Sequence, residues 1–362
     1  MKKYIFILYV CIFGLFSMTG CGNSAANSST AGQSADTLVA EPASSEGLSI
    51  VTTIFPEYDW VREILGENPS NAEITLLLDN GVDLHNYQPT TEDILKIANC
   101  DLFIYVGGES DEWVEDALKE ATNQDMVVIN LLESLGDKVK EEEIVEGMEA
   151  DEHEHEHEHE DGDEHEEGEE HEGEEHEHEE EEGPEYDEHV WLSLNNANVL
   201  VDVIRDAIIS IDSANSPVYT DNAKAYTDKL SALNEEYVKV TDEASVKTVL
   251  FGDRFPFRYL VDDYGLSYYA AFVGCSAETE ASFETVVFLA NKVDELSLPS
   301  IMTIDGSDKK IAETIKENTS SKDQEILTID SMQSTTAEDI SKGATYLSIM
   351  EGNLEVLKQA LK

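Results

Sequence analysis

From Leu48 onward, short apolar runs alternate with stretches that carry apolar residues at helical spacing. Runs rich in β-branched and aromatic residues predict strands, and apolar positions that repeat every three or four residues predict amphipathic helices. The predicted strands cover residues 48–55, 72–78, 102–106, 126–130, 246–251, 266–272, 300–304 and 325–329. The helices predicted between them cover residues 58–65, 91–97, 113–120, 255–264, 283–293 and 309–318. Strands that alternate with helices predict parallel sheets covered on both faces.

A longer helical pattern at residues 216–244 separates the two groups of strands. Its apolar residues form one stripe that is typical of core packing and carries no chemistry: Tyr226, Leu230, Leu233, Tyr237 and Val240. A helix of over twenty residues spans roughly 30 Å, long enough to connect two lobes as a rigid strut. We therefore predict an α/β fold of two lobes, at residues 48–212 and 245–362, joined by this helix.

The net charge of -57 is concentrated at residues 141–188, where most residues are acidic. A polyanion would repel nucleic acid, and no basic patch interleaved with aromatic residues is present in the sequence. Cations are the ligands that this charge favours.

Eight of the ten histidines lie inside this acidic segment, and His85 and His189 are the other two. The segment histidines are His153, His155, His157, His159, His165, His171, His176 and His178. Histidine at every second position among carboxylates predicts transition-metal capture, whereas the lack of apolar residues predicts a disordered loop at residues 140–184. The imidazoles alone do not choose between zinc, nickel and copper.

The N-terminus predicts export. Lys2 and Lys3 precede an apolar run, and small residues then lead to Cys21. This pattern resembles a bacterial lipoprotein signal at residues 1–20, with Cys21 as the lipid-modified first residue of the mature chain and residues 21–47 as a flexible tether. Of the remaining cysteines, Cys100 and Cys275 are expected to be buried, unpaired thiols.

Two motifs carry a resemblance to a known family that covers residues 50–361. Residues 81–89 read Gly-Val-Asp-Leu-His-Asn-Tyr-Gln-Pro, and residues 187–192 read Asp-Glu-His-Val-Trp-Leu. They resemble the two histidine ligand motifs of the zinc and manganese solute-binding proteins of ABC transporters. The resemblance implies that His85 and His189 are metal ligands in a cleft between the lobes, and that the His-rich insertion marks a zinc-importing member.

The second lobe departs from this pattern. Where the family has a third ligand histidine, this chain has Arg254, which cannot coordinate a cation. Asp253 could ligate instead. The fourth family ligand is acidic and follows a second-lobe strand, which implies Asp305 as first choice and Asp308 as second. Glu278 and Glu280 are expected to make loop contacts, and a thiolate ligand at Cys275 is the less favoured alternative to a buried thiol.

The resemblance implies a monomeric extracytoplasmic receptor, anchored by lipid to the outer face of a bacterial membrane, that captures Zn²⁺ and delivers it to an ABC import permease without catalysis. Carboxylate ligands would move the preference towards Mn²⁺, so a manganese receptor remains open. Two other hypotheses are a zinc hydrolase, for which the sequence shows no His-Glu-x-x-His motif, and an extracellular metal buffer or adhesin in which the tract is the whole function.

Overall fold

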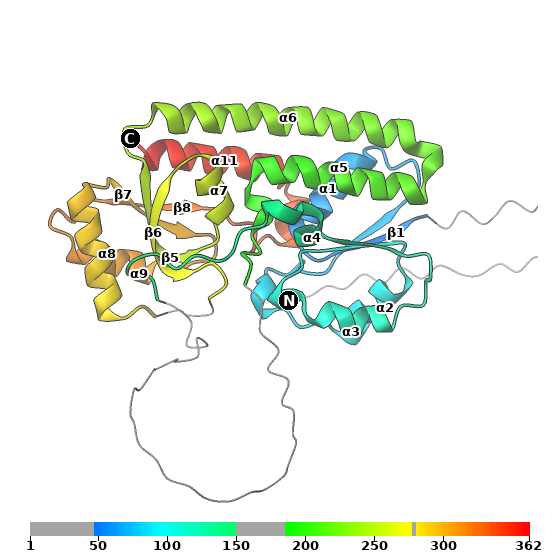
Figure 1. The fold of residues 1–362 in the computed structure, drawn as a ribbon, viewed down its shortest axis with the longest axis horizontal. Coiled ribbons are helices and arrows are strands. Elements are labelled where there is room, and N and C mark those ends of the chain that lie inside the picture. Colours follow the sequence, from blue (N-terminus) through cyan, green and yellow to red (C-terminus); the bar gives the residue numbers. More distant parts are fainter. Residues whose placement is uncertain (1–46, 150–184, 277–279) are drawn as a thin grey trace, which may run out of the picture. The chain divides into compact units, whose positions relative to one another are not determined.

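The structure is a computed structural model that describes residues 47–149, 185–276 and 280–362 (Figure 1). By its contacts the chain divides into residues 1–45 and one compact unit of residues 46–362, to which the description below is confined. The predicted signal, Cys21 and the tether up to residue 46 fall within residues 1–46, and the eight tract histidines fall within residues 150–184. These predictions therefore lie outside the described residues, as does Glu278.

The first lobe is built on a four-stranded parallel sheet with the strand order β2-β1-β3-β4. Its strands are β1 (Ser49–Thr52), β2 (Glu73–Leu76), β3 (Leu102–Tyr105) and β4 (Val127–Asn130). The helices of this lobe are α1 (Phe55–Leu65), α2 (Thr91–Asn99), α3 (Trp113–Lys119), α4 (Leu131–Leu135) and α5 (Leu194–Ile211). Thr90 caps helix α2, because its side chain and that of Asp93 form a capping box.

The second lobe repeats this topology, with a four-stranded parallel sheet in the order β6-β5-β7-β8. Its strands are β5 (Thr248–Phe255), β6 (Ser267–Val273), β7 (Ser300–Ile304) and β8 (Glu325–Ile329). Its helices are α7 (Arg258–Asp263), α8 (Phe283–Leu296), α9 (Lys310–Asn318), α10 (Ala337–Ser341) and α11 (Tyr346–Ala360). In each sheet the first strand in sequence lies between the second and the third, and the fourth lies beyond the third. The prediction of two parallel α/β lobes is confirmed.

Alternate residues of the second sheet enter two different cores. Leu250 packs with residues of α8 and α9, whereas its neighbour Phe251 belongs to a core that also contains residues of α11 and of the first lobe. Successive side chains of a strand point to opposite faces, so the sheet is covered on both. The larger core runs continuously from one lobe into the other.

Helix α6 (Ser216–Glu243) is the predicted long helix. Its 28 residues correspond to roughly 42 Å. It packs on α1 and α5 of the first lobe and on α11 of the second, and Tyr226, Leu230 and Tyr237 of its stripe are buried (Figure 1). One continuous helix therefore contacts both lobes. None of the helices in the described ranges is both long and apolar enough to cross a membrane.

The predicted disordered loop begins at residue 140, but residues 140–149 are described and lie against the second lobe. Lys140 donates its backbone N–H to the Tyr259 hydroxyl at 3.0 Å, and Glu149 donates its backbone N–H to the Ala271 carbonyl at 2.9 Å. On the far side of the tract, the Asp187 N–H returns to the Lys140 carbonyl at 2.9 Å. Hydrogen bonds from its backbone to other segments of the same chain hold this acidic stretch in place. Composition alone did not predict this order, because it does not show such bonds.

Candidate metal centre

The backbone at each motif histidine is held by a hydrogen bond to an aspartate two positions earlier. His85 lies in the short 3-10 helix η1 (Leu84–Asn86), and its backbone N–H donates to Asp83 Oδ1 at 3.1 Å. His189 immediately precedes the 3-10 helix η4 (Val190–Leu192), and its backbone N–H donates to Asp187 Oδ1 at 2.9 Å. An aspartate that accepts from the residue two positions later fixes a tight turn. Each imidazole is therefore presented from a constrained loop.

The two imidazoles face one another. The Nε2 atoms of His85 and His189 lie 3.1 Å apart, and the ring centroids lie 5.1 Å apart. His189 is fully buried, with 0% of its surface exposed. Motif positions 104 residues apart in the chain thus converge at one point, as the sequence predicts for two ligands of one ion.

The opposite edge of each imidazole is occupied by an oxygen. His85 Nδ1 lies 2.7 Å from Ser110 Oγ and 3.4 Å from Glu188 Oε2, and His189 Nδ1 lies 3.1 Å from Asp187 Oδ1. Metal-binding histidines usually give their second N–H to a carboxylate, hydroxyl or carbonyl oxygen, which fixes the tautomer. With the proton on Nδ1, both Nε2 lone pairs are directed to the shared space between the rings.

The charges around His85 favour its protonated form when no metal is bound. Burial lowers the pKa of His85, but the hydrogen bond to Glu188 and the charge of Asp83 outweigh burial and raise this pKa above its usual value. Where His85 is protonated, a cation has to displace that proton to bind. Metal affinity should fall in acid.

The second lobe contributes three side chains to this point. Gln333, in the loop after β8, places Nε2 3.2 Å from His189 Nε2 and 3.2 Å from Asp83 Oδ1. Arg254, on β5, donates to Asp83 Oδ2 at 2.6 Å. Cys275, just after β6, completes a group with His85 and His189 whose potential ligand atoms all lie within 4.8 Å of one another. Both lobes therefore meet at the histidine pair.

The predicted carboxylate ligands of the second lobe already accept hydrogen bonds. Asp305 Oδ1 accepts from the backbone N–H and the hydroxyl of Ser331 at 2.6 and 2.7 Å, and Oδ2 accepts from the N–H and hydroxyl of Ser334. Asp253 Oδ1 accepts from the Arg254 N–H at 3.0 Å. Asp308 is ion-paired with Lys310.

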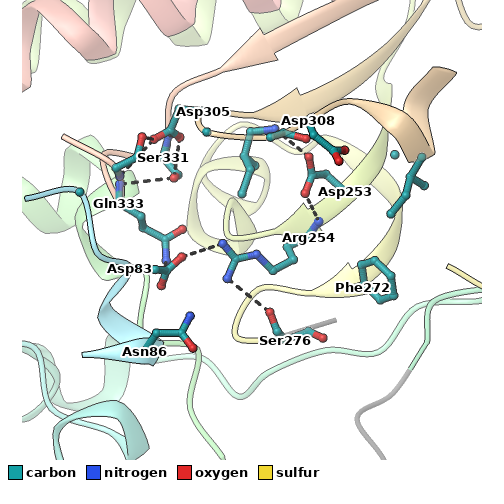
Figure 2. A pocket seen from close by; sticks show the side chains of 17 residues that line it. Asp83, Asn86, Asp253, Arg254, Phe272, Ser276, Asp305, Asp308, Ser331 and Gln333 are labelled. Carbon is teal, nitrogen blue, oxygen red and sulfur yellow. Dashed lines mark hydrogen bonds and ion pairs between the residues drawn. The ribbon is translucent and has the colours of Figure 1, made fainter. Parts of the chain in front are cut away.

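These three aspartates line a cavity of about 440 Å³ beside the histidine pair (Figure 2). Figure 2 shows Arg254 directed towards Asp83 and Ser276, with Asp253 beside Arg254 and Asp305 beside Ser331. The histidines do not line this cavity, which adjoins them through Asp83 and Gln333. The structure brings His85 and His189 together, and Asp253 and Asp305 to the neighbouring space.

Sequence reasoning missed Ser110 and Gln333 and ranked Cys275 low. Ser110 is 25 residues from His85, and Gln333 is 144 residues from His189, so no local spacing connects them. Cys275 does follow a predicted strand, at the end where ligands gather in parallel sheets. That position is the feature of the sequence that could have identified Cys275 as a candidate ligand.

A family of known proteins matches most of this chain. A protein family described as zinc-uptake complex component A, periplasmic, matches residues 50–360. The chain belongs to this family. The match covers both lobes, the linking helix and both histidine motifs, and it confirms the resemblance inferred from the motifs.

Two curated relatives are similar over most of this chain. The zinc-binding lipoprotein AdcA of Streptococcus pneumoniae is 29% identical over 312 residues, which are 86% of this chain and 55% of AdcA. This chain therefore spans about half the length of that relative. The high-affinity zinc uptake system protein ZnuA of Bacillus subtilis is 29% identical over 362 residues, which are 99% of this chain and 98% of ZnuA.

The fold agrees with a solved structure. The crystal structure of the Zn(II)-bound ZnuA-like domain of S. pneumoniae AdcA superposes with a TM-score of 0.64 at 26% identity, covering 87% of this chain and 99% of that domain. The similarity extends over both lobes.

Proposed function

We propose that this protein is an extracytoplasmic receptor that captures Zn²⁺ and delivers it to an ABC import permease. The observation that carries this function is the pair of buried imidazoles, His85 and His189, whose Nε2 atoms face one another at 3.1 Å. Family membership and the zinc-binding relatives support the same cargo. The zinc ion is a transported substrate, so the site binds the ion and releases it unchanged.

The choice of zinc over manganese rests on the donor set. Two imidazoles are first-choice ligands for zinc, whereas manganese prefers carboxylate, carbonyl and water oxygens. Asp253 and Asp305 remain predicted ligands of the second lobe. Each would have to exchange present hydrogen bonds for the ion.

The His-rich tract is proposed to collect zinc near this site, and the lipid at Cys21 to hold the receptor at the outer face of the membrane as a monomer. Residues 140–149 and 185–187, which flank the tract, pair with each other and with the second lobe. The described residues on either side of the tract are therefore held against the second lobe. Zinc bound by the tract would be held at high local concentration beside the site.

The test is native mass spectrometry of protein that lacks residues 151–182, in competing Zn²⁺ and Mn²⁺. One tightly bound zinc per chain is expected, and it should be lost in the double variant His85→Ala/His189→Ala. Tight, one-equivalent zinc binding that survives in the double variant would contradict the proposed site. One-equivalent manganese in preference to zinc would favour the manganese receptor.

The protein that lacks residues 151–182 also distinguishes the receptor from the other hypotheses. A metal buffer or adhesin that works through the tract predicts loss of essentially all tight binding when residues 151–182 are removed. A zinc hydrolase predicts turnover of ester or peptide substrates by the zinc form. The receptor predicts one retained tight site and no turnover.

A further inference from the structure

Cys275 lies beside the histidine pair from the other lobe. Its sulfur and one ring nitrogen each of His85 and His189 all lie within 4.8 Å of one another. A tetrahedral zinc with Zn–N near 2.05 Å and Zn–S near 2.3 Å needs about 3.3 Å between two nitrogens and about 3.6 Å between nitrogen and sulfur. The observed 3.1 Å between the Nε2 atoms of His85 and His189 is close to the required nitrogen–nitrogen distance. Closing a nitrogen–sulfur distance from the 4.8 Å limit to about 3.6 Å needs a shift of about 1.2 Å at most.

The turn that carries Cys275 is packed tightly against His189. A Cβ atom placed on Gly274 would lie 2.9 Å from His189 Cε1 and 3.1 Å from His189 Nδ1. Glycine therefore allows the backbone to approach the face of the imidazole, and the next residue is Cys275. The Cys275 backbone N–H also donates to Glu142 Oε1 at 3.4 Å, which ties the turn to residues 140–149.

Arg254 holds the same turn from the opposite side. Its guanidinium donates to the Ser276 carbonyl at 3.3 Å and to Asp83 Oδ2 at 2.6 Å (Figure 2). Arg254 occupies the position at which the family motif has a histidine. Here the residue at that position links the cysteine turn to the loop of His85, and it cannot ligate a cation itself.

We infer that Cys275 is a second-lobe ligand of the bound ion, as a thiolate, and that Arg254 is a positioning residue that holds its turn. This inference rests on the proposed receptor function. When Zn²⁺ binds, a Zn–S bond forms, the thiol S–H bond breaks and one proton leaves to solvent. The site then holds two imidazoles and one thiolate, a soft donor set that selects zinc over manganese.

The test uses the full chain loaded with Co²⁺ as a spectroscopic probe, together with zinc titration. Cobalt bound by a thiolate gives a sulfur-to-metal charge-transfer band in the near ultraviolet, and the tract contains no cysteine. The band is expected in the parent protein, to be absent in Cys275→Ser and to remain in Cys100→Ala, because Cys100 is a buried core thiol. Zinc should also protect Cys275 from alkylation in peptide mapping.

The zinc affinities of the variants distinguish a failure of this inference from a failure of the proposed function on which it rests. Cys275→Ser is expected to lower the affinity of the tight zinc site at least tenfold. Unchanged affinity and an unchanged cobalt spectrum in Cys275→Ser, with loss of the tight site in His85→Ala/His189→Ala, would overturn the thiolate ligand and leave the receptor intact. A tight site that survives both sets of changes would overturn the proposed function as well.

Discussion

The guanidinium of Arg254 and the carboxylate of Asp83 form an ion pair at 2.6 Å that joins the two lobes beside His85. Both side chains are largely buried, with 18% and 17% of their surfaces exposed. Asp83 also accepts the His85 backbone N–H, so the pair connects strand β5 to the loop that presents the first imidazole. Burial raises the pKa of Asp83, but the charges of His85 and Arg254 outweigh burial and hold this pKa below its usual value.

Replacing Arg254 by histidine should supply an additional imidazole. We expect Arg254→His to tighten zinc binding on the order of tenfold, equivalent to about 1.4 kcal/mol. Arg254→Gln is the matched control, because it removes the ion pair without adding a strong ligand, and it should weaken binding. Isothermal titration with zinc in competition with a chelator measures both. Equal affinities of the two variants would show that this position does not reach the ion.

Gly274→Ala should disturb the metal centre without unfolding the protein. The added methyl would lie 2.9 Å from His189 Cε1 and 3.0 Å from the Phe255 carbonyl, so the turn or the imidazole must move. We expect zinc affinity to fall tenfold or more. Gly352→Ala is the control, since nothing lies within 4 Å of its added methyl in helix α11, where alanine is favoured over glycine by about 1 kcal/mol. Unaltered affinity in Gly274→Ala would refute the tight packing of this turn on His189.

Tyr346→Phe should destabilise the fold. The hydroxyl of this fully buried tyrosine donates to the Trp191 carbonyl at 2.7 Å. Loss of the hydroxyl leaves a buried carbonyl without that donor, at a cost of about 1–3 kcal/mol in the free energy of unfolding. Urea unfolding in the presence of a chelator measures the change. Tyr186→Phe, at a tyrosine with 47% of its surface exposed, should have little effect.

Asp59→Asn should stabilise the protein at neutral pH. Asp59 is 1% exposed and accepts the Tyr346 backbone N–H at 2.8 Å. Burial raises the pKa of Asp59 to about 6, although the hydrogen bond from Tyr346 opposes the rise. Asparagine can accept the same hydrogen bond without a buried charge. An increase on the order of 1–2 kcal/mol in the free energy of unfolding at pH 7 is expected.

The sign of the pH dependence follows from this raised pKa. Between the unfolded value near 3.9 and the folded value of about 6, the folded state binds more protons. The contribution of Asp59 to stability is therefore greatest at the acid end of this interval and is lost as the pH rises through about 6. The advantage of Asp59→Asn should be small at pH 4 and full at pH 7. An advantage of equal size at both values would contradict the assignment.

The sequence predicted the lobes well because their strands are short, apolar and separated by clear helical patterns. Strands β7 (Ser300–Ile304) and β8 (Glu325–Ile329) have the bounds that the pattern predicts. Helix α10 (Ala337–Ser341) was missed, since five residues with no buried side chain leave no apolar period to recognise. Strand β5 runs to Phe255, where a helix was expected to begin, and its register shifts between Phe251 and Arg254.

The candidate metal centre was only partly predictable. His85 and His189 were identified as candidate ligands because each lies in a motif with a recognisable order of neighbours. The groups around them come from separate loops, and Gln333 and Cys275 reach the imidazoles only through the folding of the second lobe. Likewise, the family position of the third histidine identified Arg254 as a departure, but only its contacts with Asp83 and Ser276 show what it does.

Helix α6 also constrains how an empty receptor could differ from a loaded one. After Pro217 in its first turn, it contains neither proline nor glycine, the residues at which helices usually kink. It is buried against helices of both lobes. Such a helix resists bending, so wide hinge opening would break its packing. Under the proposed function, a permease would have to distinguish the loaded from the empty receptor by small displacements at the rim of the site. Solution scattering of the two states should give nearly the same radius of gyration.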